Sequence, residues 1–559
     1  MRAAVLLVIV TVAACSFGAT VATGAFVPQN DDWSFIRSAL ELHRTGQIRL
    51  QGWGQMFMLG QLVSAQPFLV VFGEHVASLK LYGVTMTAVW MWCSFVLARR
   101  CLGPRAVAVP VALALWPGLP LLASSFMTDL PAAAMALLSL VVGLHALDRQ
   151  SRRWLAVTVL VGVFGFTIRE QAVAGLGAVL VGVLLHPAAS RRFRAETLVA
   201  TASAAVVCVA LETVRHGLAH ADIPSFDVAV DMSRTWRSLL RVPFTLGLVL
   251  SPLCLWSLCL TATASHRGWP GRGRVAGWGV GLVSLAVLAA DYLPHPPRVL
   301  LSNYATPVGG FRVAAVGYVP TLAEPWLWDV AQLTGAAAGL VLLGEVGARC
   351  TSGLATVLRT GRSADPAATM LSAYTALIAG SVLALSIVGQ VQVDRYQVTM
   401  LPGLAVLLLA SAPRRPPGTA DPTVGRRAGR AAVVTAATAL SALLVTLSVT
   451  NTITTNRRDR AVWETAQRLT QRGVPATHIN AGLSWNGSHA TTPLDRDHSD
   501  SRRYRGQQWM YLFPESTDCY VVAVSQLPQH DLIPLPTAVD PGTRGVHAYR
   551  NLRCRLPLP

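Results

Sequence analysis

Charged residues are scarce in this sequence of 559 residues, where they make up 13% of the chain. A soluble globular domain carries about 25% charged residues, so a soluble fold is excluded. Lysine is almost absent: Lys80 is the only one, and the other basic residues are arginines. Arginine in place of lysine, together with abundant Ala, Val and Leu, is typical of a GC-rich bacterial genome. The composition therefore predicts a bacterial membrane protein.

Metal-binding cysteine motifs are also missing. The chain has nine cysteines, but none forms a CxxC pair or stands at Cys/His ligand spacing. We therefore expect no metal site and no required cofactor, although the sequence is compatible with a divalent metal ion. Most of the cysteines lie in apolar segments or beside arginine-rich loops; Cys519 and Cys554 lie in the polar C-terminal region.

Apolar runs of roughly 17–25 residues, the length of a bilayer-spanning helix, recur along the chain. Each must be helical, because a backbone exposed to lipid has to satisfy its own hydrogen bonds. The sequence predicts an all-α polytopic membrane protein with about 13 transmembrane helices. The predicted spans are 3–26, 76–98, 106–123, 130–147, 154–168, 171–187, 197–214, 242–263, 275–293, 327–347, 367–389, 397–412 and 431–450.

The first apolar run has two interpretations. Arg2 followed by apolar residues resembles a signal peptide, and VAAC at 12–15 resembles a lipoprotein cleavage box. The apolar stretch continues past Cys15 to Val27, however, which is longer than a signal-peptide core. We therefore favour an uncleaved first transmembrane helix.

Arginines gather in every second connection between the predicted spans. By the positive-inside rule these connections are cytoplasmic, so the formal charge of +18 reflects topology and no nucleic-acid partner is expected. The chain is predicted to lie in the bacterial plasma membrane with its N-terminus in the cytoplasm. The other connections face outward, among them the first outer loop, 27–75. Within this loop we expect an amphipathic helix over 33–46 and an interfacial or re-entrant helix over 53–72.

The C-terminal region changes character. Residues 1–450 form the predicted transmembrane domain, and 451–559 a small extracytoplasmic α/β domain with a helix over 459–472 and a strand within 519–527. Outside the cytosol, Cys519 and Cys554 can form a disulfide, with two free thiols as the alternative.

Chemically active residues gather at the predicted outer face. Asp31 and Asp32 follow the first helix, beside Trp33 and Phe35. Acidic pairs are common at helix ends, so this pair alone could be a solvated helix start. Asp129 in MTDLP stands at a second outer helix entry, where it could equally be an N-cap.

Two further motifs combine an arginine with polar neighbours at the same face. In REQ, Arg169 and Gln171 occupy a short turn between two spans. In DRY, Asp394, Arg395 and Tyr396 precede a late helix, where an arginine can meet a phosphate bidentately or simply anchor the interface. A transferase with a lipid-linked donor needs this combination: a carboxylate base for the acceptor hydroxyl and cations for the departing lipid phosphate.

These four motifs, in this order, resemble the GT-C superfamily of polyprenyl-phosphate-dependent glycosyltransferases. The likeness is to the bacterial branch of protein O-mannosyltransferases and aminoarabinose transferases, and it covers roughly residues 1–410. The resemblance implies catalytic carboxylates at Asp31, Asp32 and Asp129, with Asp31 as the base. The sequence departs from the family pattern at Glu170, which separates Arg169 from Gln171.

Together these observations predict an integral-membrane glycosyltransferase of the cell envelope. It would move a hexosyl or pentosyl group from a polyprenyl-phosphate-linked sugar to an extracytoplasmic hydroxyl of a glycan, lipid or protein, with inversion. We expect Arg395, Arg169 and Tyr396 to bind the donor phosphate. The residues expected to line the substrate site are Trp33, Phe35, Gln171 and Asp394. The alternatives are a transporter or flippase for lipid-linked saccharides, or a protein similar to O-antigen ligases and polymerases. A transporter should show repeat symmetry, which the sequence does not.

Overall fold

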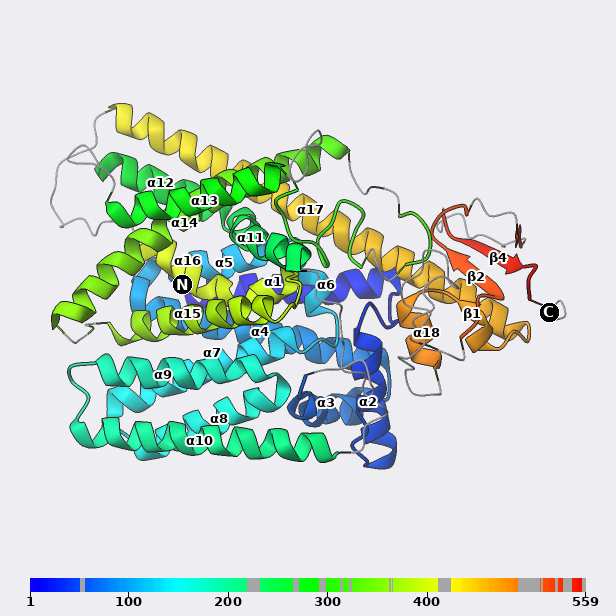
Figure 1. Ribbon diagram of the computed structural model, residues 1–559, viewed down its shortest axis with the longest axis horizontal. Helices are drawn as coiled ribbons and strands as arrows, with labels where there is room; N and C mark the ends of the chain where they lie inside the picture. The colour runs from blue at the N-terminus through cyan, green and yellow to red at the C-terminus, as the bar shows by residue number, and fades with distance from the viewer. Residues whose placement is uncertain are drawn as a thin grey trace.

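The computed structural model of the chain is a bundle of long helices with a small β-sheet at one end (Figure 1). Most of the chain is described by the structure. The ranges outside the description are 51–55, 219–231, 265–270, 291–297, 312–314, 320, 322–323, 361–362, 364, 411–423, 491–512, 514–515, 528–530, 536–544 and 555–559.

The helices account for most of the described residues, which confirms the predicted all-α membrane fold. Helices of the first half are α1 Arg2–Thr23, α2 Asp32–Thr45, α3 Leu59–Phe72, α4 Val76–Leu102, α5 Ala108–Ala114, α6 Leu119–Ala123, α7 Asp129–Arg149, α8 Arg152–Ile168, α9 Ala174–Leu185 and α10 Arg191–Gly217. Those of the second half are α11 Met232–Val249, α12 Ser251–Ala264, α13 Arg272–Ala290, α14 Pro325–Thr360, α15 Pro366–Ile387, α16 Leu401–Ala410, α17 Val424–Gln471 and α18 Leu483–His489. Short 3₁₀ turns are η1 Gly103–Val107, η2 Glu170–Val173, η4 Asp394–Met400 and η5 Ala476–His478.

Eight helices in the described part of the chain are long and apolar enough to cross a bilayer, or nine if α11 and α12, bent by 75°, form one span. The chain is therefore a multi-span membrane protein. The prediction of 13 spans also counted shorter or broken segments. For example, the predicted span 106–123 contains the separate helices α5 and α6, and 171–187 begins with the η2 turn. The full count of 13 stays a prediction.

The first outer loop contains the two helices that its sequence predicted. Helix α2 coincides with the amphipathic segment, and the 14-residue α3 is too short to span the hydrocarbon core. Gly24 ends α1 in a left-handed conformation, with φ of 62°, where a side chain on any other residue would be strained. The chain therefore turns sharply at the end of α1 and delivers Asp31 to the start of α2.

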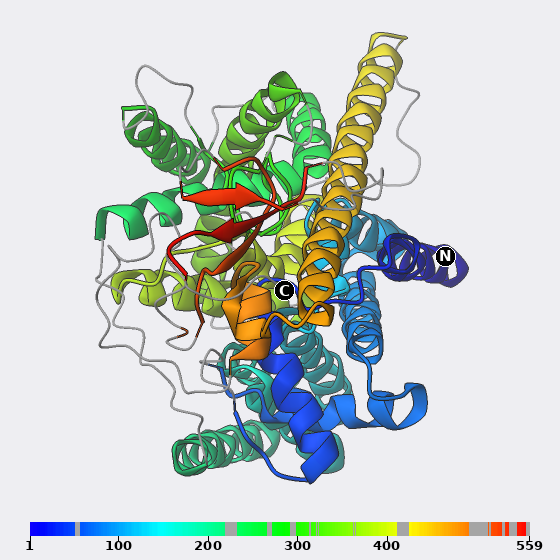
Figure 2. The same ribbon diagram turned by 90° about the vertical axis from the view of Figure 1, so that its right-hand side faces the viewer.

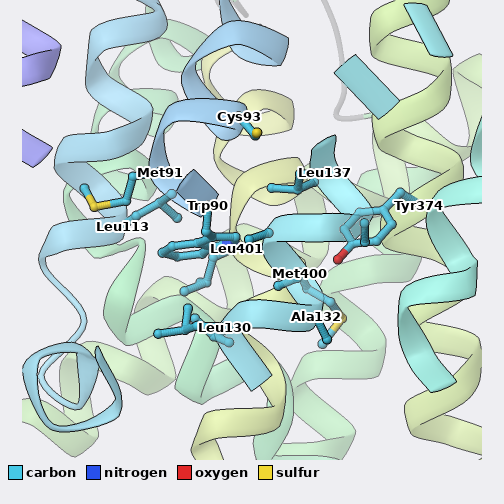
Figure 3. Packing of buried hydrophobic residues seen from close by; sticks show 14 of the residues in the cluster. Trp90, Met91, Cys93, Leu113, Leu130, Ala132, Leu137, Tyr374, Met400 and Leu401 are labelled. Atoms are coloured by element: carbon cyan, nitrogen blue, oxygen red, sulfur yellow. The ribbon is translucent and has the colours of Figure 1, made fainter. Parts of the chain in front are cut away.

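The core of the bundle is built where α4, α5, α7 and α16 meet. Trp90 lies fully buried there among Leu113, Leu130 and Leu401, one from each of the other three helices (Figure 3). Lipid chains are as apolar as these side chains, so such contacts stabilise the bundle mainly through close packing. This packing fixes the outer ends of α4, α7 and α16, where the candidate site residues lie.

The small domain is an α/β unit at one end of the bundle, as predicted. Its strands are β1 Ile479–Asn480, β2 Tyr520–Ala523, β3 Leu532–Pro534 and β4 His547–Asn551, in the order β1-β2-β4-β3. The β1–β2 pairing is parallel, and the β2–β4 and β3–β4 pairings are antiparallel. The structure joins the sulfurs of Cys519 and Cys554 in a disulfide, with Cα atoms 5.4 Å apart. This bond closes a 35-residue separation, for which chain-entropy estimates give about 3–4 kcal/mol.

Helix α17 connects the two parts of the molecule. It runs for 48 residues without a break, so the expected helix over 459–472 is continuous with the last predicted span. Figure 2, which looks at the end with the sheet, shows the strands and α18 in front of the bundle and close to α2. Trp33 of α2 is buried there, and its ring packs edge-on against Phe513. The backbone of Gly487 in α18 lies so close to this ring that a larger residue at Gly487 would collide with it. The small domain thus covers the first outer loop.

Candidate functional site

The predicted outer motifs converge at the end of the bundle that carries the small domain. Asp31 is the N-cap residue of α2, and its Oδ2 accepts hydrogen bonds from Arg395 at 2.9 Å and from the Asn30 amide at 3.1 Å. Asp31 and Arg395 are 364 positions apart in the chain. The structure therefore brings the proposed base and the proposed phosphate ligand into one ion pair.

Arg395 is held in place by its neighbour in the sequence. The buried Asp394 carboxylate accepts backbone N–H groups of Tyr304 at 3.0 Å, Ala305 at 2.8 Å and Arg395 itself at 2.8 Å. Burial raises the pKa of Asp394 to about 6, although these hydrogen bonds favour the charged form. Asp394, predicted to line the substrate, is positioned to fix the backbone before Arg395.

A second ion pair lies beside the first. Arg169 donates to Oδ1 of Asp129 at 2.7 Å, and both side chains are buried. The guanidinium carbons of Arg169 and Arg395 lie 5.0 and 5.2 Å from the centre of the Tyr396 ring, within cation–π range. The Tyr396 ring thus contacts both guanidinium groups and offsets part of the repulsion between the two cations. The three residues assigned to the donor phosphate are adjacent.

Several polar atoms at this junction have no hydrogen-bond partner within the described ranges. They include Nε of Arg395 and Oδ2 of Asp129. A buried N–H group without an acceptor is costly, and a charged one more so. A phosphate oxygen at the guanidinium would supply the missing acceptor for Arg395.

Asp32 is more deeply buried than Asp31 and faces a different set of groups. It accepts from the backbone N–H of Gln29 at 2.5 Å and of Phe126 at 3.4 Å, so it ties the first outer loop to the connection between α6 and α7. Burial raises its pKa to about 7, and the charge of the buried Lys80 opposes that rise. The only lysine in the chain is thus part of the site's framework, since its ammonium group donates to Gln29 Oε1 at 2.9 Å. Because Lys80 is the only lysine in a sequence with few charged residues, its presence alone could have indicated a role in the site.

Helix α17 supplies polar contacts that the sequence motifs did not reveal. Asn456 and Asp459 each accept a hydrogen bond from the Gln29 amide, at 3.1 and 3.0 Å. One and two turns earlier on the same face, Thr455 accepts from Gly310 N–H and Asn451 donates to Tyr304 C=O. The helix therefore anchors both the loop that carries Asp31 and the loop that Asp394 holds. A row of Asn, Thr and Asp at helical spacing in an apolar segment could have indicated such a face.

The remaining predicted site residues lie at the edge of this cluster or in the packing around it. Trp33 and Phe35 are buried, Trp33 beneath α18 and Phe35 in the main core. Gln171 is partly exposed in the η2 turn. The preceding Glu170, the departure from the family pattern, pairs with Arg215 at 2.9 Å, so it does not compete with Asp129 for Arg169. The described residues contain no cluster of three or more potential metal ligands.

Comparison with known proteins supports the predicted resemblance. Residues 64–213, which include α4, α7 and the Asp129–Arg169 pair, match the family described as dolichyl-phosphate-mannose-protein mannosyltransferase. The resemblance to lipid-phosphate-dependent glycosyltransferases is thus confirmed. No curated protein matches the chain.

Three solved structures of other proteins are similar to this chain at low sequence identity. ArnT from Cupriavidus metallidurans bound to undecaprenyl phosphate is 13% identical, with 98% of this chain and 97% of that chain covered and a TM-score of 0.49. AglB from Archaeoglobus fulgidus, in complex with an inhibitory peptide and a dolichol-phosphate, is 12% identical, with 93% and 69% covered and a TM-score of 0.46. EmbB from Mycobacterium smegmatis, an arabinosyltransferase, is 14% identical, with 95% and 45% covered and a TM-score of 0.27.

Proposed function

We propose that this chain is an integral-membrane glycosyltransferase that moves a sugar from a polyprenyl-phosphate donor to an acceptor hydroxyl outside the cytoplasm. The observation that supports this most is the Asp31–Arg395 ion pair, at 2.9 Å, beside the Asp129–Arg169 pair. It combines a carboxylate suited to proton transfer with two guanidinium groups suited to a phosphate. The site would face the outside of the bacterial plasma membrane, with the N-terminus in the cytoplasm.

The reaction would be a single displacement with inversion at the anomeric carbon. The Asp31 carboxylate takes the proton of the acceptor hydroxyl as its oxygen attacks the sugar. The bond from the anomeric carbon to the phosphate oxygen breaks, and polyprenyl phosphate leaves with its electron pair. Arg395, with Arg169 beside it, stabilises the charge that develops on the leaving phosphate.

The ion pair suggests how donor binding prepares the base. Arg395 holds Asp31 Oδ2 through Nη2 at 2.9 Å, while its Nε has no acceptor among the described residues, so a donor phosphate could bind at Nε beside the carboxylate. A phosphate bound there would share the charge of the guanidinium, weaken its hold on Asp31 Oδ2 and leave the carboxylate able to turn toward the acceptor. The Asn30 amide, which also contacts Oδ2, would limit that movement.

The proposal is tested by transfer from a lipid-linked donor by the full-length chain in lipid nanodiscs. Donor lipids extracted from source cells that lack the gene are radiolabelled in their sugar, and membranes of the same cells serve as acceptor. Asp31→Asn should insert normally yet lose about 10²–10⁴-fold in rate, the contribution of a positioned base. Glu41→Gln, the same charge change on the same helix, is the matched control. Transfer by Asp31→Asn at the parent rate would refute the assignment of the base.

A further inference from the structure

Asn30, the residue before the proposed base, has an uncommon backbone conformation. Its φ of 51° lies in the left-handed region, which residues other than glycine seldom adopt. Asparagine tolerates this region better than most residues, because its short polar side chain can form local hydrogen bonds. Here the side-chain amide donates to Oδ2 of Asp31 at 3.1 Å. The chain thus turns at Asn30 in a conformation in which its side chain holds the next carboxylate.

The Oδ2 atom of Asp31 is held by two donors of different chemistry. Arg395 donates to it at 2.9 Å through a charged guanidinium, and Asn30 donates through a neutral amide. A guanidinium also attracts a phosphate, whereas a neutral amide has no charge with which to do so. Asn30 is therefore the donor that continues to orient Asp31 when the donor phosphate shares Arg395.

Helix α18 of the small domain holds the start of α2 at two places. The Ser484 hydroxyl donates to the backbone carbonyl of Asn30 at 3.2 Å. Further along α2, Nη1 of Arg37 donates to the carbonyls of Gly487 and Ala490 at 2.7 and 2.8 Å. These partners are 450–454 positions apart in the chain, and Figure 2 shows α18 beside α2. The folded small domain thus supplies contacts to the residue that orients the base.

The residue before Asn30 is also fixed. The buried Gln29 side chain accepts from Lys80 of α4 and donates to Asn456 and Asp459 of α17. The peptide groups on both sides of Asn30 therefore belong to held residues, and Asn30 has little freedom to leave its left-handed conformation.

We propose that Asn30 is a positioning residue for Asp31, and that α18 of the small domain keeps Asn30 in place. This proposal rests on the proposed function, because it needs a base at Asp31. It gives the small domain a part in the reaction: its contacts align a carboxylate that lies in the first outer loop. The competing role for Asn30 is purely structural, as a turn between α1 and α2.

Asn30→Gly separates the amide from the backbone. Glycine adopts the left-handed region freely, so this variant keeps the turn and loses the hydrogen bond to Asp31. Gln150→Gly is the matched control, because Gln150 also has a left-handed backbone, with φ of 48°, and follows α7 at the end opposite to Asp129. Each full-length variant is reconstituted in nanodiscs and assayed as above, with donor and acceptor varied in turn.

Asn30→Gly should lower the maximal rate of transfer about tenfold, the order expected for one lost hydrogen bond to a charged group. The amounts of donor and of acceptor for half-maximal transfer should stay at the parent values, because the proposed role acts on Asp31 alone. Gln150→Gly should match the parent in all three quantities. A parent-like maximal rate in Asn30→Gly would overturn the proposal, as would a change confined to the half-maximal amounts.

A double variant shows whether Asn30 acts through Asp31. Asn30→Gly is added to Asp31→Asn, and the residual transfer is compared with that of Asp31→Asn alone, at enzyme concentrations at which the slower rate is measurable. A residue that acts through the base has no further effect once the base is gone, so the two residual rates should be equal. A further loss of about tenfold in the double variant would indicate the purely structural role and overturn the proposal.

Ser484→Ala tests the contribution of the small domain. It removes the hydroxyl that donates to the Asn30 carbonyl, so the maximal rate should fall several-fold while the half-maximal amounts stay unchanged. Ser488→Ala, the same substitution in the same helix, is the control, because the Ser488 hydroxyl has no hydrogen-bond partner among the described residues. Equal rates for the two variants would overturn the part assigned to α18.

The same measurements separate this proposal from the proposed function. If the parent chain transfers no sugar, the proposed function fails. If the parent transfers sugar and Asp31→Asn does so far more slowly, but Asn30→Gly keeps the parent rate, only the positioning role is wrong.

Discussion

Two arginine–carboxylate pairs flank one tyrosine ring, and they differ in depth. The carboxylate of Asp31 is 16% exposed, whereas that of Asp129 is 2% exposed. Asp31 caps α2 on a loop, while Asp129 lies in the first turn of the membrane helix α7. A negative charge is stabilised near a helix N-terminus, so both positions favour carboxylates. Asp31 is thus the more accessible of the two carboxylates, which is why we propose it, and not Asp129, as the base.

The difference suggests a division of labour between chemically identical pairs. Arg169 and Asp129 are enclosed, and their task is to hold each other and to face Tyr396. A buried ion pair is costly to break, so it makes a rigid wall. In the other pair the Asp31 carboxylate is more exposed, and its Oδ2 is shared between Arg395 and the Asn30 amide. The same residue types thus serve as framework in one place and as reactive groups in the other.

Replacing each of the two carboxylates by an amide should give the largest difference in transfer rate between the two ion pairs. Asp31→Asn removes the proposed base and should slow transfer about 10²–10⁴-fold. Asp129→Asn keeps the shape but weakens the hold on Arg169, for which we expect a loss of about tenfold and reduced stability in the membrane. Single-turnover transfer with saturating donor measures both. A larger loss of transfer rate in Asp129→Asn than in Asp31→Asn would reverse the assignment of the base.

Replacing each of the two arginines by lysine compares how much each contributes to binding of the donor phosphate. Lysine keeps the charge but cannot bridge two phosphate oxygens. Arg395→Lys should raise the donor concentration for half-maximal transfer about tenfold, and Arg169→Lys less, because Arg169 is already engaged by Asp129. The assay varies donor at fixed acceptor, after both variants are shown to be equally abundant. Equal values for Arg395→Lys and the parent would make that arginine an interface anchor.

Removing the Tyr396 ring, which both arginines contact, should weaken donor binding moderately. Tyr396→Leu deletes two cation–π contacts of about 0.5–2 kcal/mol each, so donor use should weaken several-fold. Tyr396→Phe retains the ring and should resemble the parent. Donor titration of the two variants side by side separates the contribution of the ring from that of the hydroxyl. A large defect in Tyr396→Phe would show that the hydroxyl, and not the ring, matters here.

The last prediction concerns stability and not transfer, through its dependence on pH. Burial raises the pKa of Asp32 to about 7, so the folded protein binds that proton more tightly than the unfolded chain. Its contribution to stability is complete below about pH 4, is lost as the pH rises to about 7, and is constant above that. The melting temperature of the parent, measured against Asp32→Asn, should therefore fall between about pH 4 and about pH 7. A difference between the two proteins that does not change with pH would contradict the assignment.

The fold and the order of the motifs were largely predictable from the sequence. Helix segments follow from apolar length, and α2 and α3 of the first outer loop lie where their patterns predicted. The strand at Tyr520–Ala523 was visible in its β-branched run. The number of spans was less predictable, because a short apolar run and a broken helix such as α5 and α6 have the same composition as a complete span.

By itself, the sequence predicted which residues carry chemistry and at which face of the membrane they lie, and it determined the membrane-protein class through its long apolar runs. Composition and hydropathy are local properties, and the outer acids and arginines could be read from them. Only the tertiary structure decided which partners they have: Asp31 with Arg395, Asp129 with Arg169, and Asp32 near Lys80. It also buried Trp33 and Phe35, which the sequence had assigned to the substrate. The physical reason is that these contacts join positions far apart in the chain, and helix packing, not local pattern, sets how their side chains meet.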